Sequence, residues 1–187
     1  MNTPALIKVW DLPLRIFHWL LVLGFAVAYL TEDDLLDLHV WAGYLVFGLL
    51  LFRLVWGFIG NPYARFGNFL CRPVTSFNYL KDIIALKAKR YLGHNPAGAA
   101  MIVLLLLSLL MTTLTGFAVY GADQAAGPLA SIGPAHEKFW EEIHELFANL
   151  SVVLVLGHIA GVAVESFLHK ENLARAMVHG NKKPLDE

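Results

Sequence analysis

The sequence predicts an all-α integral membrane protein. We expect a four-helix bundle with both termini in the cytoplasm and an amphipathic interfacial helix between the second and third spans. Of the 187 residues, 57% are hydrophobic, and the mean hydropathy of +0.57 is too high for an ordinary soluble domain of this size. Four apolar segments are long enough to cross a bilayer. These observations predict a single transmembrane domain over residues 1–187.

The expected spans are residues 12–30, 38–59, 97–120 and 143–168. No small-residue cleavage site follows the first apolar stretch, so we expect it to be a retained span rather than a cleaved signal. The third span is preceded by Asn95 and Pro96, which are typical of an N-cap and a first helical turn. Tryptophans lie near the span ends, as in the aromatic belts of membrane proteins: Trp19, Trp41, Trp56 and Trp140.

Charged residues predict the orientation, because basic residues favour the cytoplasmic side. The turn after the first span, TEDDLLD, contains only acidic charges, and the connection between spans three and four contains one lysine, Lys138. Residues 75–91 are apolar on one side and basic on the other, which predicts an amphipathic helix on the cytoplasmic membrane surface. Basic residues gather before the first span, in the middle connection and in the tail: Lys8, Arg15, Arg65, Arg72, Lys81, Lys87, Lys89, Arg90, Lys170, Arg175, Lys182 and Lys183.

Four histidines in the spans carry the functional signal. His144 and His158 are fourteen residues apart, close to four helical turns, so they share a face and lie ~21 Å apart along the helix axis. His18 lies near the cytoplasmic end of span one, and His39 at the periplasmic start of span two. Matching the depths pairs His18 with His158 and His39 with His144. Such pairs are typical of two bis-histidine haem sites in a helix bundle.

The same spans contain residues suited to a haem group. Gly43 and Gly161 would let a flat macrocycle approach, although glycines also pack helices together. Arg53 is the one basic residue deep inside a span, and a buried arginine in a membrane needs a partner. A haem propionate is one candidate, since guanidinium pairs with carboxylate. Snorkelling of Arg53 to the cytoplasmic interface is equally consistent with the sequence.

The remaining histidines are weaker candidates. His136 competes with His144 but falls in the loop outside the span, so we favour His144 as the ligand. We expect a cap or surface position for His94 and solvated positions for His169 and His179 in the polar tail. The single cysteine, Cys71, excludes an internal disulfide and a CxxCH motif, so any haem is held non-covalently.

Five motifs together resemble the prokaryotic cytochrome b561 family, which overlaps the b-type cytochrome subunits of nickel-iron hydrogenases. They are RIFHW at Arg15–Trp19, HVWAGY at His39–Tyr44, FRLVWGFIG at Phe52–Gly60, GHNPAGA at Gly93–Ala99 and LGHIAG at Leu156–Gly161. The resemblance implies two b haems, quinone as substrate, a periplasmic redox partner and location in the bacterial inner membrane. It matches His18, His39, His144 and His158 to the family's four ligands.

These features predict a di-haem cytochrome b that transfers electrons between the quinone pool and a periplasmic protein such as a c-type cytochrome. We place the quinone near the cytoplasmic haem, where Arg15, Arg53 and the helix at residues 75–91 shape an interface. No nucleic-acid partner is expected, and the oligomeric state is left open. One alternative is a superoxide oxidase that reduces quinone, although acidic periplasmic segments repel an anionic radical. A second alternative is a subunit of a hydrogenase-like complex. A third is a histidine-based metal transporter, which would need carboxylates or thiols within the spans.

Overall fold

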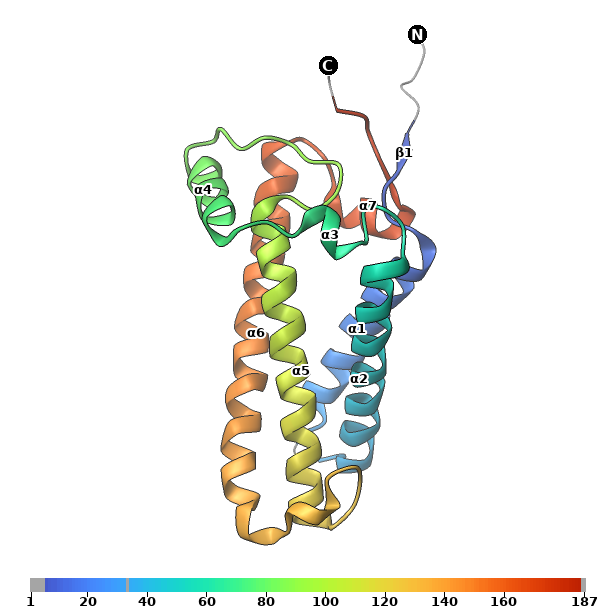
Figure 1. Cartoon of the computed structure of the whole chain (residues 1–187), viewed down its shortest axis with the longest axis vertical. Coiled ribbons are helices and arrows are strands. Elements are labelled where there is room, and N and C mark those ends of the chain that lie inside the picture. The colour runs from blue at the N-terminus through green and yellow to red at the C-terminus, as the bar shows by residue number, and fades with distance from the viewer. Residues whose placement is uncertain (1–5, 33, 186–187) are drawn as a thin grey trace. The chain divides into compact units, whose positions relative to one another are not determined.

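The computed structural model describes residues 6–32 and 34–185. Its four long helices are α1 (Leu12–Leu30), α2 (Leu36–Ile59), α5 (Pro96–Gln124) and α6 (Glu137–Leu168) (Figure 1). All four are long and apolar enough to cross a membrane. Large apolar side chains on them are exposed, among them Phe58 and Phe167 at 69% and 86%. Lipid can cover these side chains, and the chain is a multi-pass membrane protein of mostly helical fold, as predicted.

Short elements complete the described chain. They are β1 (Ile7–Lys8), α3 (Phe66–Phe69), α4 (Pro73–Ile84), α7 (Leu173–His179) and β2 (Asn181–Lys182), with 3₁₀ turns at Ala130–Ile132 and Pro134–His136. β1 pairs antiparallel with β2, which joins the two ends of the described chain. The helix expected at residues 75–91 is shorter: α4 ends at Ile84 because Leu86 adopts a positive φ of 56°.

Local sequence explains where several helices begin. Asp11 caps α1, since its Oδ1 accepts the backbone N–H of Leu14 at 3.0 Å. Asn95 caps α5 in the same way, with its Oδ1 2.7 Å from the backbone nitrogen of Gly98, and Pro96 occupies the first turn. The N-cap and proline predicted for the third span are therefore confirmed.

The chain divides into two compact units, and the long helices contribute to both. The first unit comprises Met1–Trp19, Phe52–Val103 and Leu156–Glu187. Val9 and Ala64 are fully buried in it, and Asn61 donates from Nδ2 to the carbonyl oxygen of Val9 at 3.1 Å. These contacts hold the segment before α1 against the segment after α2.

The second unit comprises Leu20–Leu51 and Leu104–Val155. Val46, Leu50 and Leu109 form its core. A polar contact ties α5 to α6, because the hydroxyls of Ser108 and Ser151 lie 2.8 Å apart and Ser151 is fully buried. Interhelical hydroxyl contacts of this kind hold helices together in lipid, where apolar burial gives little preference for one neighbour over another.

Candidate functional site

The second unit brings His39 of α2 and His144 of α6 together. Their ring centroids are 6.0 Å apart and the ring planes are nearly perpendicular, at 84°. His39 Nδ1 lies 2.8 Å from the carbonyl oxygen of Ala28, and His144 Nδ1 lies 2.9 Å from that of Thr112. A carbonyl oxygen only accepts, so both Nδ1 atoms carry the proton. An imidazole that carries its single proton on Nδ1 keeps the lone pair of Nε2 for a metal.

A cavity opens beside this pair. Gly43 and Gly116 line it together with both histidines. A Cβ atom on Gly43 would meet nothing within 4 Å, whereas one on Gly116 would lie 3.0 Å from His144 Cε1. Gly116 therefore makes room for the imidazole of His144. Gly43 leaves space in the cavity for a bound group.

The first unit brings His18 of α1 and His158 of α6 together, with ring centroids 6.4 Å apart and planes at 53°. The ring of Trp19 packs edge-on against His18 at 5.0 Å. His18 Nδ1 is buried and has no hydrogen-bond partner among the described residues. A Cβ on Gly161 would meet nothing within 4 Å, so space remains on the His158 side of α6.

These geometries fit a haem iron. A histidine nitrogen lies about 2 Å from a metal and the ring centre about 1 Å further on, so imidazoles on opposite sides of one ion have centroids about 6 Å apart. Both pairs have that spacing. Each pair supplies two nitrogen donors, as required by an iron whose other four ligands are porphyrin nitrogens. One histidine of each pair, His144 or His158, lies on α6, and these two residues are about four helical turns apart in the sequence.

Arg53 is buried, at 2% exposure, and does not snorkel to solvent. Its Nη2 donates to the carbonyl oxygen of Ala64 at 3.1 Å, and its guanidinium lies 4.6 Å from the ring centre of Phe66. Its Nη1 is buried without a hydrogen-bond partner among the described residues. A buried guanidinium with a free donor is suited to an anionic group such as a propionate.

Arg15 is anchored at the C-terminal end of α7. Its Nη1 donates to the carbonyl oxygen of Val178, at the end of α7. Its Nε is buried and has no partner in the described residues. Arg15 thus ties α1 to the segment before β2 and retains one unused donor.

His94 is the functional candidate that the sequence undervalued. Its ring lies between Trp10 and Phe69, with both centroids 4.6 Å away, rather than at the surface. Burial of the ring lowers the pKa of His94 to about 3, and the positive charges of Arg53 and Lys182 act in the same direction. His94 is therefore neutral at physiological pH. The sequence signal was its place in GHNPAG, directly before Asn95, the N-cap of α5.

Two other histidines follow expectation and one does not. His136 is exposed in the turn before α6, and His179 is exposed at the end of α7. The expectation of a solvated His169 was wrong: its side chain is 13% exposed and its Nε2 lies 3.2 Å from Glu165 Oε2. His169 directly follows α6 and continues its last turn, with its backbone N–H donating to the carbonyl oxygen of Glu165 at 3.0 Å, so its side chain lies beside that of Glu165.

Comparison with known proteins gives a consistent match. A family model described as prokaryotic cytochrome b561 matches residues 9–180. A "Probable Ni/Fe-hydrogenase B-type cytochrome subunit" of Rhizobium leguminosarum bv. viciae is 26% identical over 214 aligned positions, covering 94% of this chain and 88% of that protein. The "Probable Ni/Fe-hydrogenase 1 B-type cytochrome subunit" of Escherichia coli (strain K12) is 28% identical over 211 positions, covering 92% and 88%.

Both alignments are longer than the 187 residues of this chain, so these relatives contain segments within the aligned region that it lacks. No solved structure gives a significant match.

Proposed function

The chain belongs to the prokaryotic cytochrome b561 family, and from that premise we propose that it is a di-haem b-type cytochrome of the bacterial inner membrane. It transfers electrons between the quinone pool and a periplasmic redox partner. The observation that carries this proposal is the spacing of two histidine pairs, with ring centroids 6.4 Å apart for His18 and His158 and 6.0 Å for His39 and His144.

In this proposal the four histidines would hold two haems b. A bound haem iron supplies one-electron redox chemistry. The backbone carbonyls of Ala28 and Thr112 hold the rings of His39 and His144 in one tautomer, so their Nε2 atoms stay available. Arg53 offers its free Nη1 to a propionate, and Gly43 and Gly161 leave room for the macrocycles.

The basic residues support an orientation with both described ends and α4 on the cytoplasmic side. α4 itself is amphipathic: Val74, Phe77 and Ile84 are 68%, 58% and 84% exposed, whereas Ser76 and Tyr79 are buried. An exposed apolar stripe on a short helix next to membrane spans is suited to the lipid headgroup boundary. We therefore place α4 in the cytoplasmic interface.

We place the quinone on the same side, near the haem of His18 and His158. A hollow in the first unit supports this choice; its lining includes Tyr63, Phe69, Tyr91 and His94. Aromatic rings suit a quinone ring, and the neutral imidazole of His94 offers hydrogen bonding to its oxygens. Arg15 and Arg53 add positive charge to this unit.

A periplasmic c-type cytochrome is the partner that we favour, since the acidic residues of the second unit would attract a basic protein. A second candidate is a subunit role in a hydrogenase complex, which the names of the relatives favour. The same acidic residues disfavour superoxide oxidation, because they repel an anionic substrate.

Haem quantification tests the core of the proposal. Purified protein should give two haems b per chain in a pyridine haemochrome assay and two components in the reduced-minus-oxidised visible spectrum. One haem per chain, or none, would contradict the proposal. Co-purification of hydrogenase subunits from native membranes would favour the second candidate over a soluble cytochrome partner.

A further inference from the structure

Glu165 is a buried acidic side chain on the helix that carries His158. It is 7% exposed and lies seven residues, or two turns, after His158 on the same face of α6. The two side chains are therefore separated by about 10 Å along the helix axis. A carboxyl group at this depth is expensive to ionise without partners, so its surroundings decide what it does.

Tyr79 of α4 can hydrogen-bond to Glu165 in either protonation state of the carboxyl group. Its hydroxyl oxygen lies 3.1 Å from Glu165 Oε1 and 2.8 Å from the carbonyl oxygen of Lys89. The hydroxyl has one proton, and the Lys89 carbonyl can only accept. With an ionised Glu165, Tyr79 donates to the carboxylate. With a protonated Glu165, the carboxyl donates to the hydroxyl oxygen of Tyr79, and Tyr79 donates to Lys89. Both protonation states are thus hydrogen-bonded without any movement of the backbone.

His169 gives the carboxyl group a route to water. Its Nε2 lies 3.2 Å from Glu165 Oε2, and its side chain is 13% exposed. The alignment of this contact is poor for a hydrogen bond, and Nε2 is otherwise without a partner among the described residues. A small rotation of the imidazole would allow a proton to pass between the carboxyl group and solvent.

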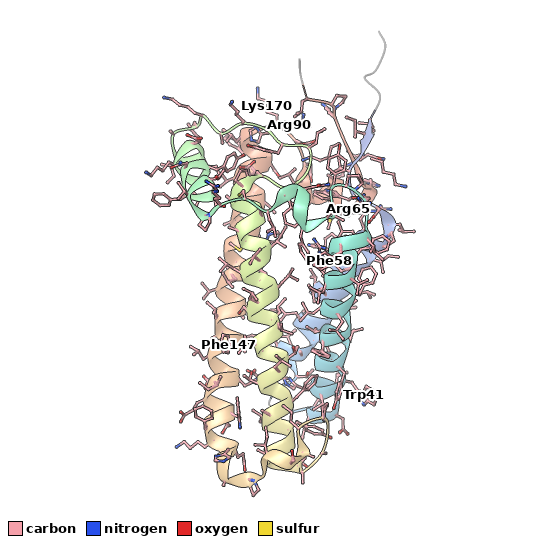
Figure 2. The ribbon with its side chains drawn as sticks, viewed as in Figure 1. Trp41, Phe58, Arg65, Arg90, Phe147 and Lys170 are labelled. Carbon is pink, nitrogen blue, oxygen red and sulfur yellow. The ribbon has the colours of Figure 1, made fainter. Side chains whose placement is uncertain are left out.

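The other charged groups around this cluster are already paired. Arg90 bonds both carboxylate oxygens of Glu171, at 2.9 and 3.1 Å, and Lys182 of β2 lies 3.4 Å from the same carboxylate. Arg90 and Lys170, the residue before Glu171, are both labelled at the top of Figure 2. Among the described residues, no lysine or arginine lies within ion-pair distance of Glu165.

The groups that face Tyr79 keep it protonated. Burial and the charge of Glu165 raise the pKa of Tyr79 above its ordinary range, with smaller contributions from Tyr91 and Asp82. Lys182 of β2 is the cation on the strand side of this cluster, and its Nζ donates to the carbonyl oxygen of Tyr91 at 3.1 Å. Tyr79 therefore stays neutral and has one proton to donate to either acceptor.

We propose that Glu165 takes up one proton when an electron enters the haem held by His18 and His158, and releases it when the electron leaves. Quinol or another reductant supplies the electron, the proton comes from water through His169, and Tyr79 redirects its hydroxyl from the carboxylate to Lys89. The electron adds one negative charge to a haem whose ligand His158 is on the same helix as Glu165. In surroundings of low dielectric, this charge favours protonation of the Glu165 carboxylate. This inference rests on the proposed haem at that pair.

The test is a spectroelectrochemical titration of the purified holoprotein at several pH values. His158→Ala first identifies which haem component belongs to this pair. In the wild type, the midpoint potential of that component should fall as pH rises, and in Glu165→Gln it should stay level over the same range. In Tyr79→Phe, the midpoint potential should fall with the same slope but over a range at higher pH, because the ionised carboxylate loses a hydrogen-bond donor. Glu141→Gln, an exposed site at the other end of α6, should behave as wild type.

Infrared difference spectra give a second readout that does not depend on activity. The reduced-minus-oxidised spectrum should contain the carbonyl stretch of a protonated carboxylic acid, and Glu165→Gln should lack it. An unchanged pH slope in Glu165→Gln, or no such band in the wild type, would overturn the inference while leaving the haem site intact. If His158→Ala retained both haem components, the proposed haem site would fail, and this inference with it.

Discussion

The Nδ1 atom of His144 lies 2.9 Å from the carbonyl oxygen of Thr112, one helix away. This contact fixes both the tautomer and the orientation of the ring, because the carbonyl can only accept a proton. His39 is held in the same way by Ala28. Two rings that are anchored at Nδ1, with centroids 6.0 Å apart, form a preorganised pair of nitrogen donors for a metal. Partners of this kind are typical of histidines that bind metals.

The histidine pairs should be separable by substitution. His18→Ala and His158→Ala should each remove the same haem component, and His39→Ala and His144→Ala should each remove the other, because a bis-histidine site loses its geometry when either ligand is absent. The haem-to-chain ratio should fall from two to one in every variant. The measurement is the reduced-minus-oxidised spectrum with a haemochrome assay, and His136→Ala serves as the control. If His18→Ala and His39→Ala removed the same component, the pairing would be wrong.

Gly116 should be needed for the haem of His39 and His144. A Cβ there lies 3.0 Å from the His144 ring, so Gly116→Val should displace the imidazole and lower the haem-to-chain ratio toward one. Gly48→Ala on α2 is the matched control, since its Cβ would meet nothing within 4 Å. Full haem content in Gly116→Val would show that the ring position tolerates the added side chain.

The elements and the histidine pairs were predictable because they depend on local patterns. Hydropathy located four spans, and helical periodicity with alternating chain direction placed His18 near His158. Helix ends were less predictable: α6 begins at Glu137, six residues before the expected start, because acidic residues favour a helix N-terminus but lower the hydropathy. Contacts between distant segments escaped prediction. The burial of His94 depends on Trp10 and Phe69, and that of Glu165 on Tyr79.

His94 should make the protein less stable in acid. Its pKa is about 3 in the folded state and about 6.5 in the unfolded chain, so the unfolded chain binds more protons between these values. The contribution is fully present above pH 6.5 and is lost as pH falls, by at most about 1.4 kcal/mol per pH unit. His94→Phe keeps an aromatic ring between Trp10 and Phe69 without this titration. Its thermal unfolding midpoint, followed by tryptophan fluorescence in detergent, should fall less between pH 6.5 and 4.5 than that of the wild type. Parallel curves would contradict the prediction.

Quinol should deliver electrons first to the haem of His18 and His158. His158→Ala should then abolish quinol-driven reduction of the remaining haem, because the entry point is missing. His144→Ala is the matched control: its remaining haem should still be reduced by quinol. Stopped-flow absorbance with a soluble quinol analogue measures both. Normal quinol reduction in His158→Ala would place the quinone on the other side of the membrane.

The acidic residues of the second unit should steer the electron-transfer partner. The described acidic residues of the unit that holds His39 and His144 include Glu32, Asp34, Asp37, Asp123, Glu137, Glu141 and Glu142. Asp33, also predicted for this face, lies outside the described residues. Lys138 is the basic residue among them in the described part of the unit. A surface of one sign accelerates association with an oppositely charged protein, and salt screens the attraction.

Stopped-flow electron transfer to a basic c-type cytochrome at rising ionic strength measures this steering. The bimolecular rate constant should fall about tenfold or more between low and physiological salt, since electrostatic steering contributes on the order of 10–1,000-fold. Combined replacement of Glu32, Asp33, Asp34 and Asp37 by their amides should lower the low-salt rate and flatten its salt dependence. Asp82→Asn, an exposed acid on α4, should leave both unchanged. A rate insensitive to salt and to neutralisation would mean that these acids do not guide docking, and a partner recognised through apolar or membrane-embedded contacts would then account better for electron exchange at this face.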